Sequence, residues 1–126
     1  MRAAVFVLGL LLLFGSAVAY DGLTLYTAVI TKSDRHNSKG NRLKSVRAVL
    51  RQDRANYCWR QRNNLSRGDA DYFCVAHRRN MFDSAKLRIH PRLADRIVYG
   101  RRSVTVCVFV LTHRLIEVIP GRCRDV

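Results

Sequence analysis

The sequence predicts an all-β fold, an antiparallel β-sandwich held by two disulfides. Three observations lead to this prediction. Short runs rich in β-branched and aromatic residues recur roughly every ten residues along the chain. Polar segments rich in turn-forming residues separate these runs. All four cysteines lie beyond an apolar N-terminal segment, as in secreted domains that disulfides stabilise.

The first 19 residues are typical of a cleavable secretion signal. Arg2 supplies a positive charge, residues 3–14 form an apolar core, and Ala17-Val18-Ala19 is a small-residue cleavage site. This apolar core is shorter than the roughly 20 residues that a membrane-spanning helix needs. We therefore expect a signal peptide over residues 1–19 and one secreted, extracellular domain over residues 20–126. An uncleaved membrane anchor is the alternative.

Five segments beyond the expected cleavage site are predicted as strands. The first covers residues 23–30, and a polar loop over residues 31–41 follows it. The others cover residues 70–76, 85–90, 104–111 and 115–119. Pro91 is expected to end the third strand. The last two strands are separated by only three residues, which predicts a hairpin.

Residues 43–50 fit either a helix or a strand. Leu43, Val46 and Leu50 share one helical face, and Asn41 stands in an N-cap position. The same segment also alternates between apolar and basic side chains, as a half-buried strand does. Because periodicity does not decide between them, the alternative fold is a small α+β domain with a helix at about 42–51.

The four cysteines are expected to form two disulfides. Three connectivities are open, and the equal spacing favours the sequential pairs Cys58–Cys74 and Cys107–Cys123. Zinc ligation is disfavoured because no two cysteines have the spacing of two to four residues that is common among thiolate ligands. We expect no metal and no other cofactor.

The order of these features resembles a PLAT (lipoxygenase-homology) domain, a β-sandwich family. Residues 29–41 are similar to the family's polar T-x-D loop, residues 65–75 resemble its arginine-glycine signature, and Leu87-Arg88-Ile89 matches its LRI strand. The resemblance covers about residues 23–123 but lacks the family's tryptophan after that strand. It implies a strand at 43–50 and a non-catalytic module that contacts lipid or protein partners through its loops.

The chain is strongly basic, with 23 basic and 9 acidic residues and a formal charge of +14. This charge favours anionic partners, and arginine forms bidentate contacts with sulfate, phosphate and carboxylate groups. The candidate anion-binding residues in predicted loops are Arg60, Arg62, Arg78, Arg79, Arg101 and Arg102. A further basic cluster contains Lys32, Arg35, Lys39, Arg42 and Lys44. Separate solvated patches are the alternative interpretation.

Trp59, next to Arg60, is the candidate apolar anchor for a membrane interface, and burial in the core is its alternative role. We therefore expect a secreted, non-enzymatic module that binds an anionic lipid surface or a sulfated glycan, with no specific nucleic acid partner. A cationic host-defence or venom-type effector is the first alternative. The sequence does not indicate an oligomeric state.

Arg67-Gly68-Asp69 is the tripeptide that many integrins recognise, so an integrin ligand with a cell-surface receptor as partner is a second alternative. Asn64-Leu65-Ser66 is an N-glycosylation sequon, and a glycan on Asn64 would crowd the tripeptide. The bland alternative is that the tripeptide is only the turn before a strand.

The histidines are the remaining candidates for catalysis or metal binding: His36, His77, His90 and His113. None has a partner at ligand spacing, and the sequence contains no recognisable hydrolase, metalloprotease or phosphate-binding motif. We therefore do not expect an enzyme. A secreted basic ribonuclease that uses two histidines is the alternative.

Overall fold

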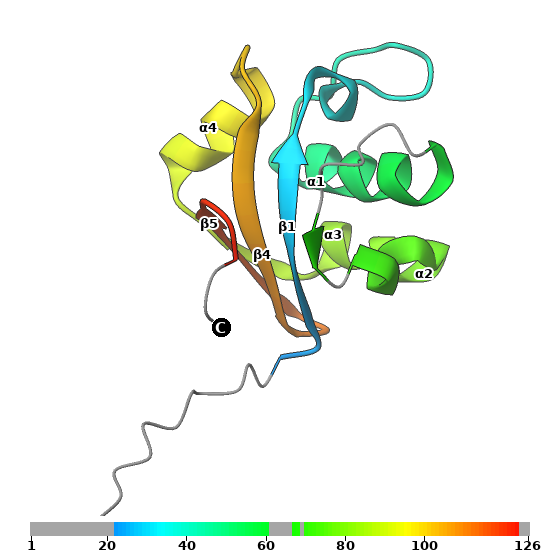
Figure 1. Cartoon of the computed structure of the whole chain (residues 1–126), viewed down its shortest axis with the longest axis vertical. Coiled ribbons are helices and arrows are strands. Elements are labelled where there is room, and N and C mark those ends of the chain that lie inside the picture. The colour runs from blue at the N-terminus through cyan, green and yellow to red at the C-terminus, as the bar shows by residue number, and fades with distance from the viewer. Residues whose placement is uncertain (1–21, 61–66, 69, 124–126) are drawn as a thin grey trace, which may run out of the picture.

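The computed structural model describes residues 22–60, 67–68 and 70–123, which form a mixed α+β fold (Figure 1). The predicted all-β sandwich is therefore wrong, and the alternative prediction of a small α+β domain with a helix near 42–51 fits. The strand at 43–50 and the β-sandwich that the PLAT resemblance implied are wrong with it. The expected signal peptide lies outside the described residues.

The described strands form one sheet in the order β2-β1-β4-β5-β3. They are β1 (Thr24–Ile30), β2 (Arg67–Gly68), β3 (Lys86–Ile89), β4 (Val104–Thr112) and β5 (Leu115–Pro120). Neighbouring strands are antiparallel except β3 and β5, which are parallel. The strands predicted near 23–30, 85–90, 104–111 and 115–119 are confirmed, as is the β4–β5 hairpin.

Helices cover one face of this sheet (Figure 1). The α-helices are α1 (Val46–Ala55), α2 (Ala76–Arg79), α3 (Met81–Ser84) and α4 (Pro91–Tyr99). Two 3-10 turns, η1 (Lys32–Arg35) and η3 (Ala70–Cys74), and a π-helical turn, η2 (Asn56–Arg60), complete the described helical segments. Helix α1 contacts both β1 and α4. Their apolar side chains form one core with those of β4, in which Ile30, Leu50, Ile97 and Val106 are fully buried.

Helix α1 forms because its N-terminus is capped and its apolar residues lie on one face. The Ser45 hydroxyl accepts a hydrogen bond of 3.1 Å from the Ala48 amide, so Ser45 is the N-cap in place of the predicted Asn41. Val49 and Leu50 are buried on the inner face of the helix. A strand would alternate these two neighbours between opposite faces, whereas one turn of a helix directs both toward the core.

Residues 70–76, predicted as a strand, instead form η3 and the start of α2. Tyr72 and Phe73 both pack against the core, and their rings meet edge to face at 5.1 Å between centroids. A strand would place these consecutive side chains on opposite faces, which explains why the prediction is wrong. A tight turn therefore places both side chains against the core, and the contact between the two rings stabilises this turn.

Pro91 ends the β3 region, as predicted, and also begins α4. Proline is favoured in the first helical turn, because it lacks an N–H that would find no partner there and its φ angle already suits the helix. The His90 ring caps the same end by accepting a hydrogen bond of 3.1 Å from the Arg92 amide.

Two disulfides, Cys58–Cys74 and Cys107–Cys123, join the four cysteines in the sequential pairing that the spacing favours. The first joins η2 to η3, and the second ties the C-terminal segment to the middle of β4. The Cys123 amide also donates to the Thr27 hydroxyl at 3.0 Å. No helix within residues 22–60, 67–68 and 70–123 has the length and apolar character needed to cross a membrane.

A charged pair lies inside the core. Arg54 and Asp53 are both fully buried, and the Arg54 Nε donates to the Asp53 carboxylate at 2.7 Å. The Arg54 guanidinium also lies over the Tyr26 ring, 4.0 Å from its centroid. Burial by itself would lower the pKa of Arg54, but the adjacent Asp53 carboxylate raises it above its ordinary value.

Other arginines hold the ends of short helices. Arg47 donates to the carbonyls of Phe82 and Ala85, at 2.9 and 2.6 Å, where α3 ends. Arg79, nearly buried, donates to the Phe73 carbonyl at 2.8 Å. The last carbonyls of a helix have no partner within the helix, so these guanidinium groups replace the missing amide donors.

Candidate anion-binding site

Two segments distant in the sequence meet at one end of the sheet. In the antiparallel pair of β1 and β4, Ile30 at the end of β1 lies opposite Val104 at the start of β4. Turn η1, which follows β1, is therefore placed beside residues 100–103, which precede β4 (Figure 1). We call this end of the molecule, formed by residues 31–45 and 91–103, the basic end. These residues include nine arginines and lysines but only two acidic residues, Asp34 and Asp95.

The loop over residues 36–44 is built by its own hydrogen bonds. The Asn37 side-chain oxygen accepts from the amides of Lys39 and Asn41 at 3.0 and 2.9 Å. Gly40 has a φ angle of 81°, a left-handed conformation that glycine adopts without strain. His36 and Arg42 pair across the loop as an isolated β-bridge. This hydrogen bonding gives the basic residues of the loop fixed positions.

Two arginines attach η1 and this loop to the C-terminal end of α4. The Arg35 Nε donates to the Ile97 carbonyl at 2.8 Å, and one of its Nη atoms donates to the Arg102 carbonyl at 2.7 Å. The Arg42 Nη2 donates to the Val98 carbonyl at 2.8 Å. The partial negative charge at the end of a helix favours cations there, so both arginines are held close together despite their like charge.

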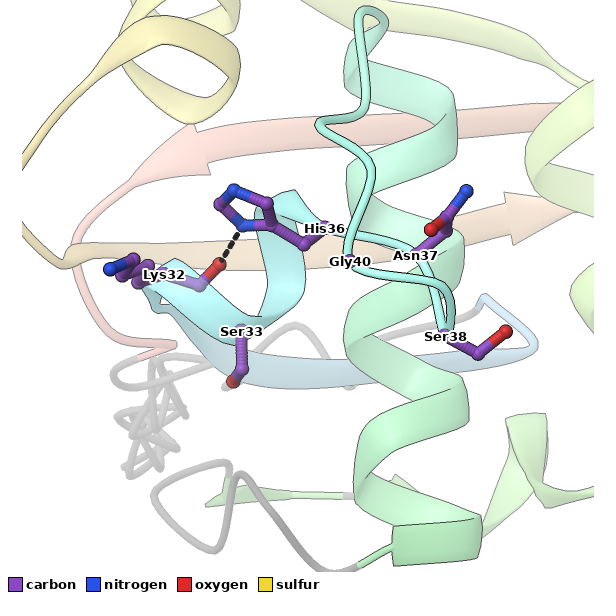
Figure 2. Close-up of a pocket in the computed structure, with 6 residues that line it drawn as sticks. All are labelled: Lys32, Ser33, His36, Asn37, Ser38 and Gly40. Atoms are coloured by element: carbon purple, nitrogen blue, oxygen red, sulfur yellow. Dashed lines mark hydrogen bonds between the residues drawn. The ribbon is translucent and has the colours of Figure 1, made fainter.

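These contacts enclose a hollow of about 270 Å³, which we call the basic hollow. Its lining consists of Lys32, Arg35, His36, Arg42, Gly100 and Arg101. Two further hollows adjoin it. One of about 380 Å³ shares Gly100 and Arg101 and adds Arg96, Arg102, Ser103 and Val104. The other, of about 460 Å³, is shown in Figure 2 and is lined by Lys32, Ser33, His36, Asn37, Ser38 and Gly40.

The cations of the basic hollow repel one another, and this repulsion affects the pKa of Arg35. Burial lowers the pKa of Arg35, and the positive charge of Arg42 lowers it further, against the opposing effect of Asp34. Because guanidinium groups remain protonated in proteins, the repulsion is not relieved by loss of a proton. A bound anion would relieve it, and a recessed site concentrates the positive potential.

His36 and Gly100 set the shape of the hollow. The His36 Nδ1 lies 2.8 Å from the Lys32 carbonyl oxygen, which only accepts, so Nδ1 carries a proton and the ring is held in place (Figure 2). A Cβ on Gly100 would lie 2.3 Å from the Arg96 carbonyl oxygen and 3.3 Å from the Arg35 guanidinium. The Arg96 carbonyl therefore requires glycine where the chain leaves α4, whereas the flexible Arg35 side chain would need to shift only slightly.

The structure separates the six arginines that the sequence analysis selected. Arg101 and Arg102 are exposed at the basic end, whereas Arg78 and Arg79 belong to α2, at the far side of the molecule (Figure 1). Arg78 lies over the Tyr72 ring, 4.5 Å from its centroid, and donates to the Tyr72 carbonyl. Arg60 ends η2, and Arg62 lies outside the described residues.

Trp59 lies in η2 and is not part of the core, since 68% of its surface is exposed. The Arg79 guanidinium lies 5.6 Å from its ring centroid. Trp59 also lines a hollow of about 470 Å³ together with Ser38, Gln52, Ala55 and Asn56. The exposed indole therefore belongs to a recessed surface next to the loop of the basic end.

The other sequence motifs lie away from this site or outside the described residues. Arg67 and Gly68 form β2, which pairs with β1, whereas Asp69 and the Asn64 sequon lie outside the described residues. His77 lies in α2, His90 caps α4, and His113 lies in the β4–β5 turn. Within the described parts of the chain, no three histidine, cysteine or acidic side chains are grouped so as to hold a metal ion.

Most residues of the basic hollow were not among the candidate anion-binding residues predicted from the sequence. Lys32, Arg35 and Arg42 were recognised only as a basic cluster, and His36 only as an isolated histidine. Gly100 was not selected. The available signal was the run of basic residues directly after the first strand, but the strand that returns beside it, β4, could not be paired with β1 from periodicity.

Comparisons of this chain with protein-family models, with curated proteins and with solved structures find no match. The resemblance to PLAT domains therefore stays a prediction as regards the family. The geometry of the site has to support any functional conclusion by itself.

Proposed function

We propose that this protein is a secreted, non-enzymatic module whose basic hollow binds sulfate or phosphate groups displayed on extracellular surfaces. These groups are supplied by sulfated glycans or by acidic lipids. One observation carries the proposal: one lysine and three arginines, from two segments distant in the sequence, line a single hollow. The N-terminal secretion-like segment and the two disulfides support an extracellular location.

The chemistry of the hollow suits a compact oxyanion. Arg101 is exposed and Arg42 uses one Nη atom on a carbonyl, so N–H groups of both remain for a ligand. Lys32 adds a third cation to the lining. Arginine offers paired donors that match the oxygens of sulfate and phosphate. Of the two acidic residues at the basic end, Asp34 is fully buried, so it leaves the surface positive.

Heparin-affinity chromatography and sedimentation with phosphatidylserine-containing vesicles test the proposal with the disulfide-bonded protein. The test variant is Lys32→Glu with Arg101→Glu. The matched control is Lys86→Glu with Arg114→Glu, which makes the same change in net charge at exposed positions near the β4–β5 turn, at the other end of β4 (Figure 1). A general effect of charge would act on both variants equally.

We expect the test variant to bind heparin or vesicles about tenfold more weakly than the unmodified protein at low ionic strength. The control should lose much less. Equal losses in the two variants would show that attraction is spread over the surface and would contradict a site at the basic hollow. Failure of the unmodified protein to bind either probe at physiological salt would also contradict the proposal.

A further inference from the structure

The basic hollow is one end of a longer groove. The hollow shown in Figure 2 shares Lys32 and His36 with the basic hollow, and it shares Ser38 with the hollow that contains Trp59. Because they share lining residues, the three hollows adjoin one another. We call this surface, from Arg101 through the loop over residues 36–44 to Trp59, the long groove.

The two ends of the long groove differ in chemistry. The basic hollow brings four cationic side chains together. Beyond Lys32, the groove is lined by neutral hydroxyl and amide groups of Ser33, Asn37, Ser38 and Gln52. Trp59 then supplies a large exposed aromatic surface. A ligand that fills the groove must therefore carry its negative charge at one part and hydroxyl groups and an apolar ring face at another.

Resting on the function proposed above, we infer that the long groove binds a linear sulfated polysaccharide chain. A sulfated sugar unit occupies the basic hollow, neighbouring sugar hydroxyls hydrogen-bond the polar middle, and the C–H face of a further ring packs on Trp59. Tryptophan suits this contact because its side chain combines a large apolar face with one N–H donor. The chain therefore binds along its length, with its charged part fixed by arginine.

The position of Trp59 is fixed before any ligand arrives. Cys58, its neighbour, is joined to Cys74, so η2 is covalently attached to η3. The Arg79 guanidinium lies over the indole ring and is itself anchored to the Phe73 carbonyl. A side chain held in this way loses little conformational freedom on binding, which makes it an effective contact.

A lipid membrane and a nucleic acid fit the long groove less well. Recessed hollows separate the cations from Trp59, whereas a bilayer surface requires the basic and apolar groups to reach the same level. A nucleic acid carries a phosphate at every residue, but the lysine and arginines that line the long groove all belong to the basic hollow, and Arg79 beside Trp59 donates to the Phe73 carbonyl. A sulfated glycan fits this distribution, because each of its sugars also presents hydroxyl groups and an apolar C–H face beside its charged groups.

Fluorescence titration tests the inference, since Trp59 is the only tryptophan of the chain. The disulfide-bonded protein is titrated with a heparin disaccharide and with a heparin decasaccharide, and affinities of the variants are measured by calorimetry. Trp59→Ala is the test variant. Tyr99→Ala is the matched control, because Tyr99 is 64% exposed at the end of α4 but does not line any of the three hollows of the long groove.

We expect the decasaccharide, but not the disaccharide, to change the fluorescence of Trp59. Trp59→Ala should weaken decasaccharide binding about tenfold and leave disaccharide binding unchanged, because only the longer chain reaches the indole. Tyr99→Ala should change neither affinity. Equal effects of the two aromatic variants, or fluorescence that does not respond to the decasaccharide, would overturn the inference.

Two further probes and one further variant separate the possible failures. Tighter binding to phosphatidylserine vesicles than to the decasaccharide, with a blue shift of Trp59 emission, would assign the groove to membranes and overturn the glycan. Equally effective competition by an oligothymidylate would overturn it as well. If Lys32→Glu with Arg101→Glu weakens decasaccharide binding and Trp59→Ala does not, only the long-groove inference fails. If neither variant has an effect, the proposed function fails with it.

Discussion

The arginines of this chain fall into two regions with contrasting surroundings. Arg54 and Arg79 lie inside the fold, where one is paired with a buried carboxylate and the other is bonded to a backbone carbonyl. Arg101 and Arg102 are exposed beside the basic hollow. Arginine therefore donates hydrogen bonds to internal acceptors in one region and generates a positive surface in the other.

This difference shows why a count of basic residues overstates the charge available to a ligand. The described part of the chain contains several short helices, and each helix end leaves carbonyls without partners. Arg35, Arg47 and Arg79 donate to such carbonyls. Much of the positive charge therefore serves to complete the backbone hydrogen bonding, and only arginines and lysines with free donors remain to attract anions.

Arg35 belongs to both regions. Its guanidinium donates to three carbonyls in and just after α4, those of Arg96, Ile97 and Arg102, and its side chain also lines the basic hollow. A bound anion at this position would add to contacts that already exist, so Arg35 links the stability of the fold to the shape of the site.

The largest effect on stability is expected from the internal region, at Arg54. Arg54→Met leaves the fully buried Asp53 carboxylate without its guanidinium partner and should lower the free energy of unfolding by roughly 3–5 kcal/mol. Urea denaturation measures this change. The double variant Asp53→Asn with Arg54→Met should be less destabilised, because no buried carboxylate remains; a double variant that is less stable than Arg54→Met would contradict this account.

The next largest effect is expected at Arg35, where the two regions meet. Arg35→Leu removes hydrogen bonds to the Ile97 and Arg102 carbonyls and should destabilise the fold by about 2 kcal/mol. It should also weaken heparin binding, because the basic hollow loses a wall. Arg96→Leu, at an exposed position of α4, is the control for stability and should change unfolding little. Similar destabilisation of the two variants would show that the Arg35 hydrogen bonds contribute no more to stability than an exposed arginine does.

A pH titration tests the environment of the Arg54 pair through Tyr26. Burial raises the pKa of Tyr26 far above its ordinary value, although the positive charge of Arg54 opposes this. The folded state therefore keeps the phenol protonated when the unfolded chain ionises, so stability is complete below pH 10 and falls above it by about 1.4 kcal/mol per pH unit.

The matched variant for this titration is Tyr26→Phe. Among the described residues, the Tyr26 hydroxyl has no hydrogen-bond partner, so its loss should change stability at neutral pH by less than about 1 kcal/mol. The variant should also lose the additional decline above pH 10. Identical alkaline unfolding profiles of the two proteins would show that Tyr26 ionises as readily in the folded state as in the unfolded chain.

The smallest effect on stability is expected in the exposed region. Lys32→Glu with Arg101→Glu should change the free energy of unfolding by no more than about 0.5 kcal/mol, because no internal acceptor loses a donor. The same variant should give the largest loss of heparin affinity. Thermal unfolding and heparin affinity are measured on the same variant. A large loss of stability would show that Lys32 and Arg101 support the fold, as the buried arginines do.

The outcome of the strand predictions shows where sequence reasoning succeeded. The segments that became β1, β4 and β5 are rich in β-branched residues, and the burial of at least one face follows from that composition. Residues 70–76 have a similar composition but form η3 and α2. Local composition does not distinguish a strand from a compact aromatic turn, because both bury the same side chains.

The candidate site was less predictable than the fold. Arg101 and Arg102 were selected from the sequence, but their partners Lys32 and Arg35 lie about 70 positions earlier in the chain and meet them only through the β1–β4 pairing. Arg78 and Arg79 carry the same sequence signal, two adjacent arginines, and donate to carbonyls instead. A doublet of arginines does not reveal which of these surroundings it will have.

The sequence by itself determined the covalent framework and the central strands of this protein. The equal spacing of the cysteines indicated the two sequential disulfides, and the apolar runs indicated strand β1 and the β4–β5 hairpin, which form the middle of the sheet. Only the tertiary structure decided which positive charges face solvent. That outcome depends on where helix ends leave carbonyls without donors and on which strands pair, and both are properties of the packed chain that no local pattern of residues contains.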